Sequence, residues 1–546
     1  MLEAMLVRFT ATAAIVAVFT PFLMRAQELH ISGEKIRAHV KYLSSDDLEG
    51  RGVGTRGGRL ATEYIASQLQ AEGVKPGGDH GSYFQRVPLV GVTTLHTATL
   101  TIAGKRGRSV LRYDRDFVGA PQAQTPRDNF NAEAVFVGHG IAAPEYGWDD
   151  YKGVDVKGKV VVFFTNEPPS TDPTFFGGRA LTYYGRWTYK FEEATRRGAV
   201  AALIIHTTPT AGYGWGVVRS SGSGEHSEEA LNPGQRALKF AGWVTQSAGA
   251  KLVASTGKTV DQLLTLANQK SFRPMLLGRI TGRIPVKLRQ IESRNVIGRV
   301  EGSDPSLAPQ AVIFTAHWDH FGIGVPVNGD RIYNGAVDNA TGCGMVLDIA
   351  RVWAALPKKP KRSALFLFVT AEESGLLGSD YYGKHPTAPA GKTALDINFD
   401  AFFPFGKTRD VSVTGAERTT LWPMIQRDAQ AMHLEIKPDS EPEQGHYYRS
   451  DHFSLARVGV PAFSISAGTE YLGKPADFGS TAFEQYNNEH YHQPSDEYRD
   501  DLNFGSMVQM AEFGLRVGMD AANIPKLPTW KPGDEFLKAR QQSGVR

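Results

Sequence analysis

A continuous apolar segment, ALFLFV at Ala364–Val369, is followed almost at once by two adjacent carboxylates, Glu372 and Glu373. No polar residue interrupts the segment, and this pattern is typical of a strand buried on both faces of a sheet. The two glutamates then lie just beyond its carboxyl end, where the loops of open parallel sheets build ligand sites. Because neighbouring carboxylates repel each other, a cation between them or a proton on one of them would stabilise the pair.

Further apolar segments predict other strands of the same sheet, and amphipathic segments alternate with them. The expected strands are residues 295–300, 311–316, 395–399 and 460–465. The expected helices are residues 36–43, 60–72, 341–356, 376–383, 421–432 and 504–522. Strands that alternate with helices indicate an α/β fold with a mixed, mostly parallel central sheet flanked by helices.

A second group of short apolar strands interrupts this pattern. Its segments are AVFVGHG at 134–140, GKVVVFF at 158–164 and GAVAALIIH at 198–206, with a helical stretch at 189–197. They predict a smaller, β-rich α/β module with a sheet of its own. We expect the module at residues 130–285, inserted between residues 30–125 and 290–525 of one larger domain, with residues 526–546 as a loose C-terminal tail.

Length and composition narrow the class of protein. A chain of 546 residues is too long for one ordinary domain. Its composition is that of a globular protein, with 41% hydrophobic and 21% charged residues. The net charge of +3 and the absence of a Lys/Arg block argue against a nucleic-acid partner. Cys343 is the single cysteine, so an intramolecular disulfide is impossible.

The N-terminus resembles a secretory signal. Arg8 precedes the apolar run Phe9–Met24, and the pattern predicts a signal peptide at residues 1–26. The run is shorter than the ~20 residues that a membrane span needs, so no stable span is expected. Export to a periplasmic or extracellular location follows, with an uncleaved anchor as the alternative because Met24 departs from the small-residue rule for cleavage.

Polar side chains with metal-binding chemistry follow several of the predicted strands and loops. They are His317, Asp319, Asp338, Glu372, Glu373, Asp400 and His492. Each has an ordinary explanation when taken singly, such as a helix N-cap for Asp338 or a surface position for His492. Imidazole nitrogens and carboxylate oxygens are ligands that zinc accepts. Two histidines and three carboxylates at successive strand ends are enough for two metal sites.

The motifs that carry these residues occur in the order of a known family. They are His317-x-Asp319, Asn334-Gly-Ala-x-Asp338-Asn339, Glu372-Glu373-x-Gly375, Asp400 and Tyr491-His492-x-Pro494. The set resembles the zinc aminopeptidase family M28. In addition, residues 146–161 resemble the protease-associated domain that is inserted into many exopeptidases.

The resemblance implies two Zn²⁺ ions and assigns their ligands. Asp338 would bridge the two ions. His317 and Asp400 would complete one site, while Glu373 and His492 would complete the other. Members of the family also hold the peptide bond after the bridging aspartate in cis.

Three further residues take roles from the same resemblance. Glu372 would be the general base, since it follows a rigid strand and has no metal to bind in this scheme. Asp319 would accept the far N–H of His317 and fix its tautomer. Tyr447 would donate to the developing oxyanion, although its neighbour Tyr448 competes for that role.

The sequence therefore predicts a secreted aminopeptidase that acts on peptides with a free N-terminus. Two alternatives share the fold: a glutaminyl cyclase-like acyltransferase with one zinc, and a carboxypeptidase that reads a free carboxylate with arginines such as Arg449. A non-catalytic binding protein is a further alternative, but all five ligands and the base are present. A serine hydrolase is disfavoured, because Ser221–Gly224 lacks the strand-to-helix elbow of that class.

Overall fold

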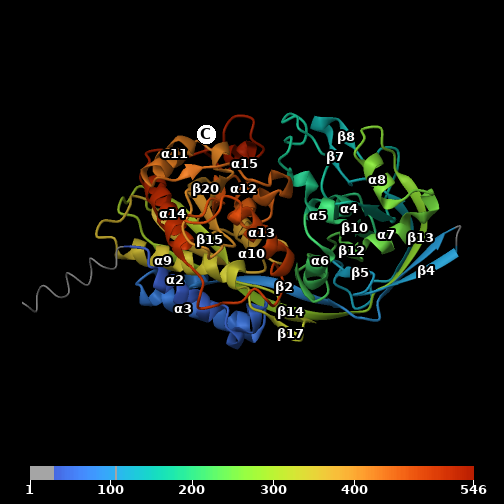
Figure 1. Ribbon diagram of the computed structural model, residues 1–546, viewed down its shortest axis with the longest axis horizontal. Coiled ribbons are helices and arrows are strands. Elements are labelled where there is room, and N and C mark those ends of the chain that lie inside the picture. The colour runs from blue at the N-terminus through green and yellow to red at the C-terminus, as the bar shows by residue number, and fades with distance from the viewer. Residues whose placement is uncertain (1–29, 105–106, 546) are drawn as a thin grey trace, which may run out of the picture.

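Two β-sheets that lie side by side form the framework of the computed structural model, which describes residues 30–104 and 107–545 (Figure 1). The first sheet has ten strands and the second has eight. The second sheet and its helices occupy the half of Figure 1 that is coloured cyan to green. The first sheet is built from segments on both sides of this stretch of the chain.

The first sheet has four parallel strands at its centre. The strand order is β11 (Glu225–Glu229), β2 (Phe84–Thr94), β14 (Val286–Val300), β18 (Ser363–Val369), β15 (Ala311–His317), β19 (Thr393–Phe399), β22 (Ala462–Ala467), β20 (Asp410–Thr414) and β21 (Glu435–Ile436), with β1 (Lys75–Pro76) paired to β14. Strands β18, β15, β19 and β22 run parallel, as do β20 and β21, and the other pairs are antiparallel. The mixed α/β fold expected from the sequence is confirmed, with the parallel pairing concentrated in the centre.

Alternate residues of the central strands enter two hydrophobic cores. Phe314 and Phe366 pack on one face with helices α9 (Thr341–Ala355) and α14 (Gly505–Asn523). Ile313 and Leu365 pack on the other face with helices α10 (Leu377–Lys384) and α12 (His452–Arg457). All seven residues of β18 are buried. Burial of each large apolar side chain contributes roughly 1.5–3 kcal/mol, so an unbroken apolar strand is stable only between two such layers.

Helices cover both faces of the first sheet. On one face lie α2 (Gly33–Leu43), α3 (Arg56–Ala71), α9 (Thr341–Ala355), α11 (Trp422–Ala431) and α14 (Gly505–Asn523). On the other lie α10 (Leu377–Lys384), α12 (His452–Arg457) and α15 (Leu537–Gln542), and α13 (Phe478–Glu489) precedes the loop that carries His492. Six of these helices, α2, α3, α9, α10, α11 and α14, agree with the predicted ones apart from shifts of a few residues at their ends, whereas α12, α13 and α15 were not predicted.

The second sheet has its own core and its own helices. Its strand order is β4 (Gly107–Arg112), β3 (Thr99–Gly104), β13 (Met275–Arg283), β6 (Phe130–Phe136), β9 (Val160–Phe163), β10 (Ala201–Ile205), β12 (Ala241–Val244) and β5 (Phe117–Ala120). Its helices are α4 (Trp187–Arg196), α5 (Thr208–Ala211), α6 (Trp215–Gly222), α7 (Gln246–Val253) and α8 (Val260–Ala267). Two small hairpin sheets pair β7 (Ala142–Ala143) with β8 (Trp148–Asp149) and β16 (Gly322–Val327) with β17 (Asp330–Tyr333).

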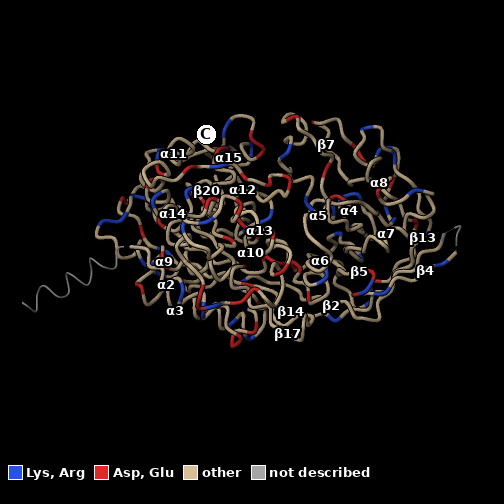
Figure 2. The backbone as a smooth tube through the Cα atoms, viewed as in Figure 1, with Lys and Arg blue, Asp and Glu red and all other residues tan. Residues whose placement is uncertain are grey.

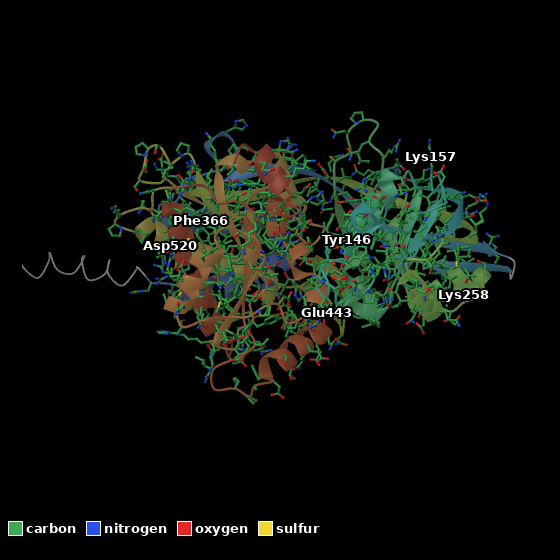
Figure 3. The ribbon with its side chains drawn as sticks, turned by 90° about the horizontal axis from the view of Figure 1, so that it is seen from above. Tyr146, Lys157, Lys258, Phe366, Glu443 and Asp520 are labelled. Atoms are coloured by element: carbon green, nitrogen blue, oxygen red, sulfur yellow. The ribbon has the colours of Figure 1, made fainter. Side chains whose placement is uncertain are left out.

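The chain passes between the sheets four times, twice through strand β11 and twice through the neighbouring strands β2 and β14, and side chains also meet where the two halves adjoin. Strand β2 leads into β3 and strand β13 leads into β14, so both connections leave the first sheet at the same edge. Figure 3 labels Glu443 where the two halves adjoin, and Arg179 pairs with it at 3.2 Å. Strand β11, from the stretch between the second sheet's strands β10 and β12, pairs with β2 of the first sheet.

The extent of the second sheet differs from the predicted range of 130–285. Strands β3, β4 and β5, at residues 99–120, also belong to it. The reason is long-range pairing: β3 pairs with β13, which lies more than 170 residues later in the chain. Hydrophobic alternation predicts a strand in this region but does not identify the sheet that the strand joins.

The prediction of a loose tail at residues 526–546 is wrong. Trp530 and Phe536 are buried in the core beneath α12, and the indole N–H of Trp530 donates to the carbonyl of Gly459 at 3.2 Å. The guanidinium of Arg540 is fully buried and donates to the carbonyls of Ala390 and Thr393 at 2.6 and 2.9 Å. The Pro/Lys-rich composition concealed these anchors, because the buried side chains are scattered among exposed ones.

The predicted signal segment, residues 1–26, lies outside the described residues. Within the part of the chain that the structure describes, no helix is long and apolar enough to cross a membrane. Figure 2 shows acidic and basic residues interspersed over both halves of the molecule, in keeping with the small net charge of +3.

Asp396, in the middle of β19, is expected to make stability depend on pH. Its side chain is fully buried; one oxygen accepts from Thr315, and the other has no partner among the described residues. Burial raises the pKa of Asp396 to about 7, even though the Thr315 bond lowers it. At a pH between 3.8, the ordinary pKa of this group, and about 7, the unfolded chain loses the proton of Asp396 while the folded chain keeps it.

Stability therefore falls as pH rises through that window, by at most about 1.4 kcal/mol per pH unit from this group. Asp396→Asn should remove this slope, and urea unfolding at pH 5 and pH 8 measures it. Asp261→Asn, at an exposed helix position, is the control. Equal pH slopes in the wild type and in Asp396→Asn would contradict this account.

Candidate metal centre

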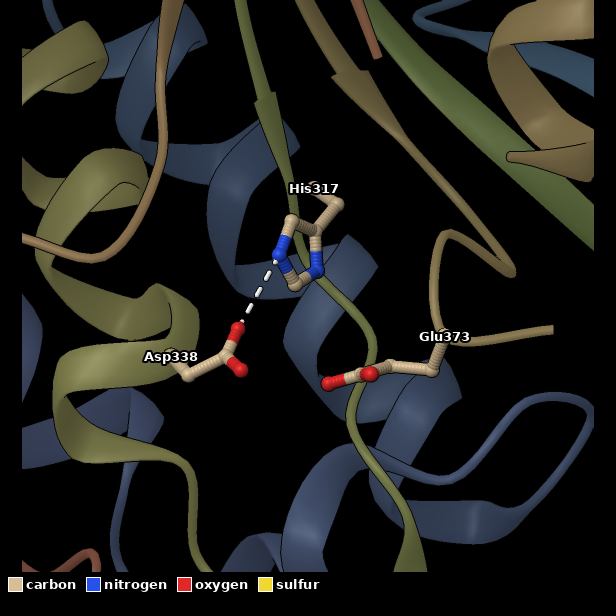
Figure 4. A group of neighbouring side chains, drawn as sticks. All are labelled: His317, Asp338 and Glu373. Carbon is tan, nitrogen blue, oxygen red and sulfur yellow. Dashed lines mark ion pairs between the residues drawn. The ribbon is translucent and has the colours of Figure 1, made fainter. Parts of the chain in front are cut away.

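Three neighbouring parallel strands deliver polar side chains to one edge of the first sheet. His317 is the last residue of β15, and Glu373 follows β18 by four residues. Asp400 follows the end of β19 directly. Because β15 pairs in parallel with both β18 and β19, these three residues leave the sheet at the same end. Figure 4 shows His317 and Glu373 on either side of the space that Asp338 faces.

Asp338 comes from a tight turn that leads into α9. Gly335 opens the turn with φ of 60°, and a Cβ there would lie 2.2 Å from the carbonyl oxygen of Asp338, so only glycine fits. The Asp338–Asn339 peptide bond is cis, as the family resemblance implies. The carboxylate of Asp496 accepts the backbone N–H groups of Val337 and Asp338, both at 3.0 Å. These contacts fix the direction in which the Asp338 side chain points.

All five predicted ligands converge around Asp338. Nε2 of His317 lies 3.2 Å from Oδ1 of Asp338 and 3.2 Å from Oδ1 of Asp400. Nε2 of His492 lies 3.4 Å from Oδ2 of Asp338 and 3.2 Å from Oε2 of Glu373. Asp338 therefore faces one histidine with each of its oxygens. His317, Asp338 and Glu373 each offer a ligand atom within 4.8 Å of the other two.

The electrostatics of this cluster suit bound cations. Burial alone would raise the pKa of Asp338. The surrounding histidines together, mainly through the hydrogen bonds to His317 and His492, have a larger, opposite effect, so its pKa lies well below the usual range. For His492, burial lowers the pKa, yet Glu373 and Asp338 raise it to about 9. Without a metal, protonated imidazoles would offset the repulsion between the carboxylates that face them. A divalent cation can replace those protons, and the nitrogen and oxygen donors fit zinc.

Glu372 lies beside the cluster without joining it. Burial raises its pKa, and the carboxylates of Glu373, Asp451 and Asp400 raise it further, so that it stands well above the usual value despite the opposing effect of His317. Its side chain lines the cavity described below. A carboxyl group with a raised pKa that is adjacent to metal ligands can take up and hold a proton.

Asp319 is close to His317 but contacts it differently from the prediction. Nδ1 of His317 lies 3.2 Å from the backbone carbonyl of Asp319 and 3.9 Å from its carboxylate. The carboxylate instead accepts the backbone N–H of Glu372 at 3.2 Å. The chain turns sharply after β15, which brings the carbonyl rather than the side chain to the imidazole. The backbone therefore fixes the tautomer of His317, and Asp319 positions the Glu372 loop.

The prediction that Tyr447 is the oxyanion donor is wrong. Its ring is buried in the core beneath α12, with the guanidinium of Arg418 4.8 Å from the ring centre. Its hydroxyl donates to the carbonyl of Ala462 at 3.2 Å. Ala462 begins β22, so this hydroxyl lies at the opposite end of the parallel strands from the ligands. Packing of the ring against Phe536 and Arg418 determines this orientation.

Two functional candidates beside the ligands were not predicted. Nδ1 of His320 lies 2.5 Å from Oε1 of Glu373, so His320 orients that carboxylate. Tyr491 stacks on His492 with ring centres 3.8 Å apart, and its hydroxyl accepts from Arg449 at 3.3 Å. His320 lies three residues after His317, and Tyr491 directly precedes His492. These positions next to the motif histidines are the signal that could have identified them.

A cavity of about 590 Å³ opens beside the cluster and is lined by both halves of the molecule. The half built on the first sheet contributes Glu372, Glu373, Arg449, Tyr491 and His492. The half built on the second sheet contributes Arg186, Tyr213, Val217, Ser221 and Trp243. Two of the candidate ligands, Glu373 and His492, thus lie at the wall of a cavity, where a substrate could reach them.

Residues 295–517 match the model of Peptidase family M28. All five candidate ligands and Glu372 lie inside the M28 match. Among curated proteins, a probable leucine aminopeptidase 2 of Aspergillus oryzae is 34% identical over 107 residues, which is 19% of each chain. Its counterpart in Aspergillus fumigatus is 27% identical over 222 residues, covering 38% of this chain and 40% of the relative. The chain thus spans less than half the length of the curated relatives it matches.

A solved aminopeptidase from Aneurinibacillus sp. strain AM-1 is similar over 93% of this chain and 98% of its own, with a TM-score of 0.54 and 18% identity. At this level of identity the likeness shows the fold. Because the match extends well beyond residues 295–517, it includes segments of both sheets.

Proposed function

We propose that this protein is a metallo-aminopeptidase that removes N-terminal residues from peptides with two zinc ions at the candidate metal centre. The observation that carries the proposal is the convergence of four residues with nitrogen or oxygen donors around Asp338, with Glu372 next to them at the wall of the cavity. The match of residues 295–517 to an M28 peptidase model supports peptide hydrolysis.

The donors divide into two sets that share Asp338. His317 and Asp400 face Oδ1 of Asp338, while His492 and Glu373 face its Oδ2. Zinc ions held by these sets would polarise the peptide carbonyl and lower the pKa of a water molecule at the site. Ser450 donates to the second oxygen of Asp400, and His320 contacts the second oxygen of Glu373, so both carboxylates are held in place.

Glu372 has the chemistry of a general base. It takes a proton from the attacking water and delivers it to the nitrogen of the leaving amine, so it must hold that proton between the two events. Its burial among carboxylates raises its pKa and so helps it to hold the proton between these events, while cations at the neighbouring ligands would favour the ionised form that the first event needs. General acid–base catalysis of this kind contributes typically 10²–10⁴-fold to a rate.

Tyr491 takes the role that the sequence suggested for Tyr447. Arg449 donates to the Tyr491 hydroxyl at 3.3 Å, which leaves the hydroxyl proton free to be donated elsewhere. Tyr491 lines the cavity next to His492 and Glu372. A donor at this position can stabilise negative charge that develops on the carbonyl oxygen of the substrate.

A comparison of blocked and unblocked substrates tests the aminopeptidase assignment. Aminoacyl arylamides with a free amine should be cleaved, their N-acetylated forms should not, and chelation should remove the activity until zinc is restored. Cleavage of the acetylated substrates at a similar rate would contradict the assignment, because an aminopeptidase requires the free amine.

A specific observation favours a second candidate, an exopeptidase that reads the C-terminal carboxylate of a short peptide. Arg186 and Arg449 both line the cavity. Nε of Arg186 is buried and has no hydrogen-bond partner among the described residues. Burial and the nearby Arg449 lower the pKa of Arg186 to about 10. Two guanidiniums that line one cavity can bind an anion, such as a carboxylate of the substrate.

Arg186→Ala should therefore lower kcat/KM on dipeptides by about 10-fold or more, since hydrogen bonds to charged groups contribute about 1.5–3 kcal/mol. Aminoacyl arylamides, which have no carboxylate, should be unaffected. Arg457→Ala is the matched control, because Arg457 lines the same cavity but already pairs with Glu192 at 3.7 Å. An equal loss on both substrate types would contradict carboxylate recognition. Cleavage of N-acetylated dipeptides would identify a carboxypeptidase.

Residues 130–285 are proposed to act as a protease-associated-type module that restricts the cavity to short peptides. Arg186, Tyr213 and Ser221 reach the cavity from this stretch, so peptides longer than the cavity should be poor substrates.

Export is proposed from residues 1–26 on the basis of their sequence pattern. The N-terminal residue of the mature protein, read by mass spectrometry after expression with the full leader, tests the export proposal.

A further inference from the structure

Helix α6, which lies in sequence between strands β10 and β12 of the second sheet, contacts the candidate metal ligand His492. Oγ of Ser221, in the last turn of α6, lies 3.0 Å from Nδ1 of His492. The neighbouring Ser220 accepts from the side-chain amide of Gln493 at 3.3 Å. Serine and histidine are 271 positions apart in the chain, so this contact depends on how α6 packs on the His492 loop.

The direction of this hydrogen bond follows from the single proton of the serine. The Ser221 hydroxyl donates to the carbonyl of Val217, four residues earlier in the helix, at 2.8 Å. With its proton used there, Oγ can only accept from His492, so Nδ1 must carry the hydrogen. The lone pair of this tautomer is then on Nε2, the nitrogen that faces Glu373 at 3.2 Å and Asp338 at 3.4 Å.

The two candidate histidine ligands are oriented by different means. Nδ1 of His317 faces the backbone carbonyl of Asp319, two residues away in the same turn. His492 lies in a loop, with φ of 55°, and its ring contacts Tyr491 in a tilted stack and Phe321 edge-on, at centre distances of 3.8 and 4.6 Å. Stacking limits the tilt of a ring but does not select which nitrogen carries the proton. Ser221 supplies that selection.

We propose that Ser221 is a positioning residue that fixes the tautomer and orientation of His492 for metal binding. The proposal rests on the proposed function, since it assigns His492 to the set that includes Glu373. It has a structural consequence: the affinity of this half of the centre depends on the docking of α6, whereas the half built from His317 and Asp400 does not. The hydroxyl is bonded to a carbonyl of its own helix, which also separates Ser221 from the activated nucleophile of a serine hydrolase.

The test measures metal binding rather than turnover. Full-length wild type, Ser221→Ala, Ser221→Thr and Ser220→Ala are stripped of metal and titrated with zinc against a chromophoric chelator, which gives two dissociation constants. Removal of a hydrogen bond to the far nitrogen of a histidine ligand typically weakens metal binding 10–100-fold. Ser221→Ala should therefore weaken one of the two sites by about 10-fold or more and leave the other within twofold.

The other variants separate positioning from packing. Ser221→Thr keeps a hydroxyl and should retain an affinity within a few-fold of the wild type, as should Ser220→Ala, which leaves His492 untouched. Cobalt substitution gives an independent readout, because a reoriented imidazole alters the visible absorption of Co²⁺ in one site only. Two unchanged constants in Ser221→Ala, or equal weakening in Ser221→Ala and Ser221→Thr, would overturn the inference. A wild type that binds no zinc would overturn the proposed function as well.

Discussion

Replacing Glu372 with glutamine is expected to lower kcat on a free-amine substrate by at least about 100-fold while zinc content stays at the wild-type level. The amide has the shape of the carboxylate but cannot take up a proton. Glu372 also makes none of the close contacts that join His317, His492, Glu373 and Asp400 to Asp338. The measurements are steady-state rates on an aminoacyl arylamide and zinc per chain.

Glu443→Gln, an exposed glutamate at the boundary of the two halves, is the control for this change. Loss of zinc in Glu372→Gln would show that the two adjacent glutamates have exchanged roles. A variant with normal zinc and a normal rate would show that another group takes the proton.

Asp338→Ala is expected to produce the opposite pattern, with loss of zinc from both halves of the centre. Each oxygen of Asp338 faces one histidine, so its removal takes one donor from each set at once. Metal per chain after dialysis against a weak chelator measures the effect, and activity should fall with it. Asp501→Ala, at an exposed position, is the control. Retention of two zinc ions in Asp338→Ala would contradict the shared position of this residue.

The elements that could be predicted from the sequence are those with a strong local pattern. The unbroken apolar segment before Glu372 and the alternation of strands and helices from residue 295 onward both predicted the first sheet, because burial on two faces leaves no place for a polar side chain. Three of the ligands, His317, Glu373 and Asp400, could be predicted to lie together for a related reason, whereas Asp338 and His492 were assigned from the motifs of the family resemblance. Parallel strands end at one edge, so polar residues placed just after several strands must lie close together.

The errors concern contacts between distant segments or between atoms of one turn. Tyr447 was assigned from its place in a motif, but packing of its ring against Arg418 and Phe536 directs the hydroxyl to the far end of β22. The carbonyl of Asp319, not its carboxylate, meets His317 because of a backbone turn that composition does not encode. The contact of Ser221 with His492 joins two helix and loop segments that no sequence pattern relates.

A zinc titration of the metal-depleted protein, with bound zinc and the rate on a free-amine arylamide followed together, decides whether the centre works with two zinc ions. We expect no turnover without metal, a rate that rises with bound zinc, and a maximum when two ions are bound per chain. Full activity in the metal-depleted protein, or no activity with both sites filled, would contradict a two-zinc aminopeptidase.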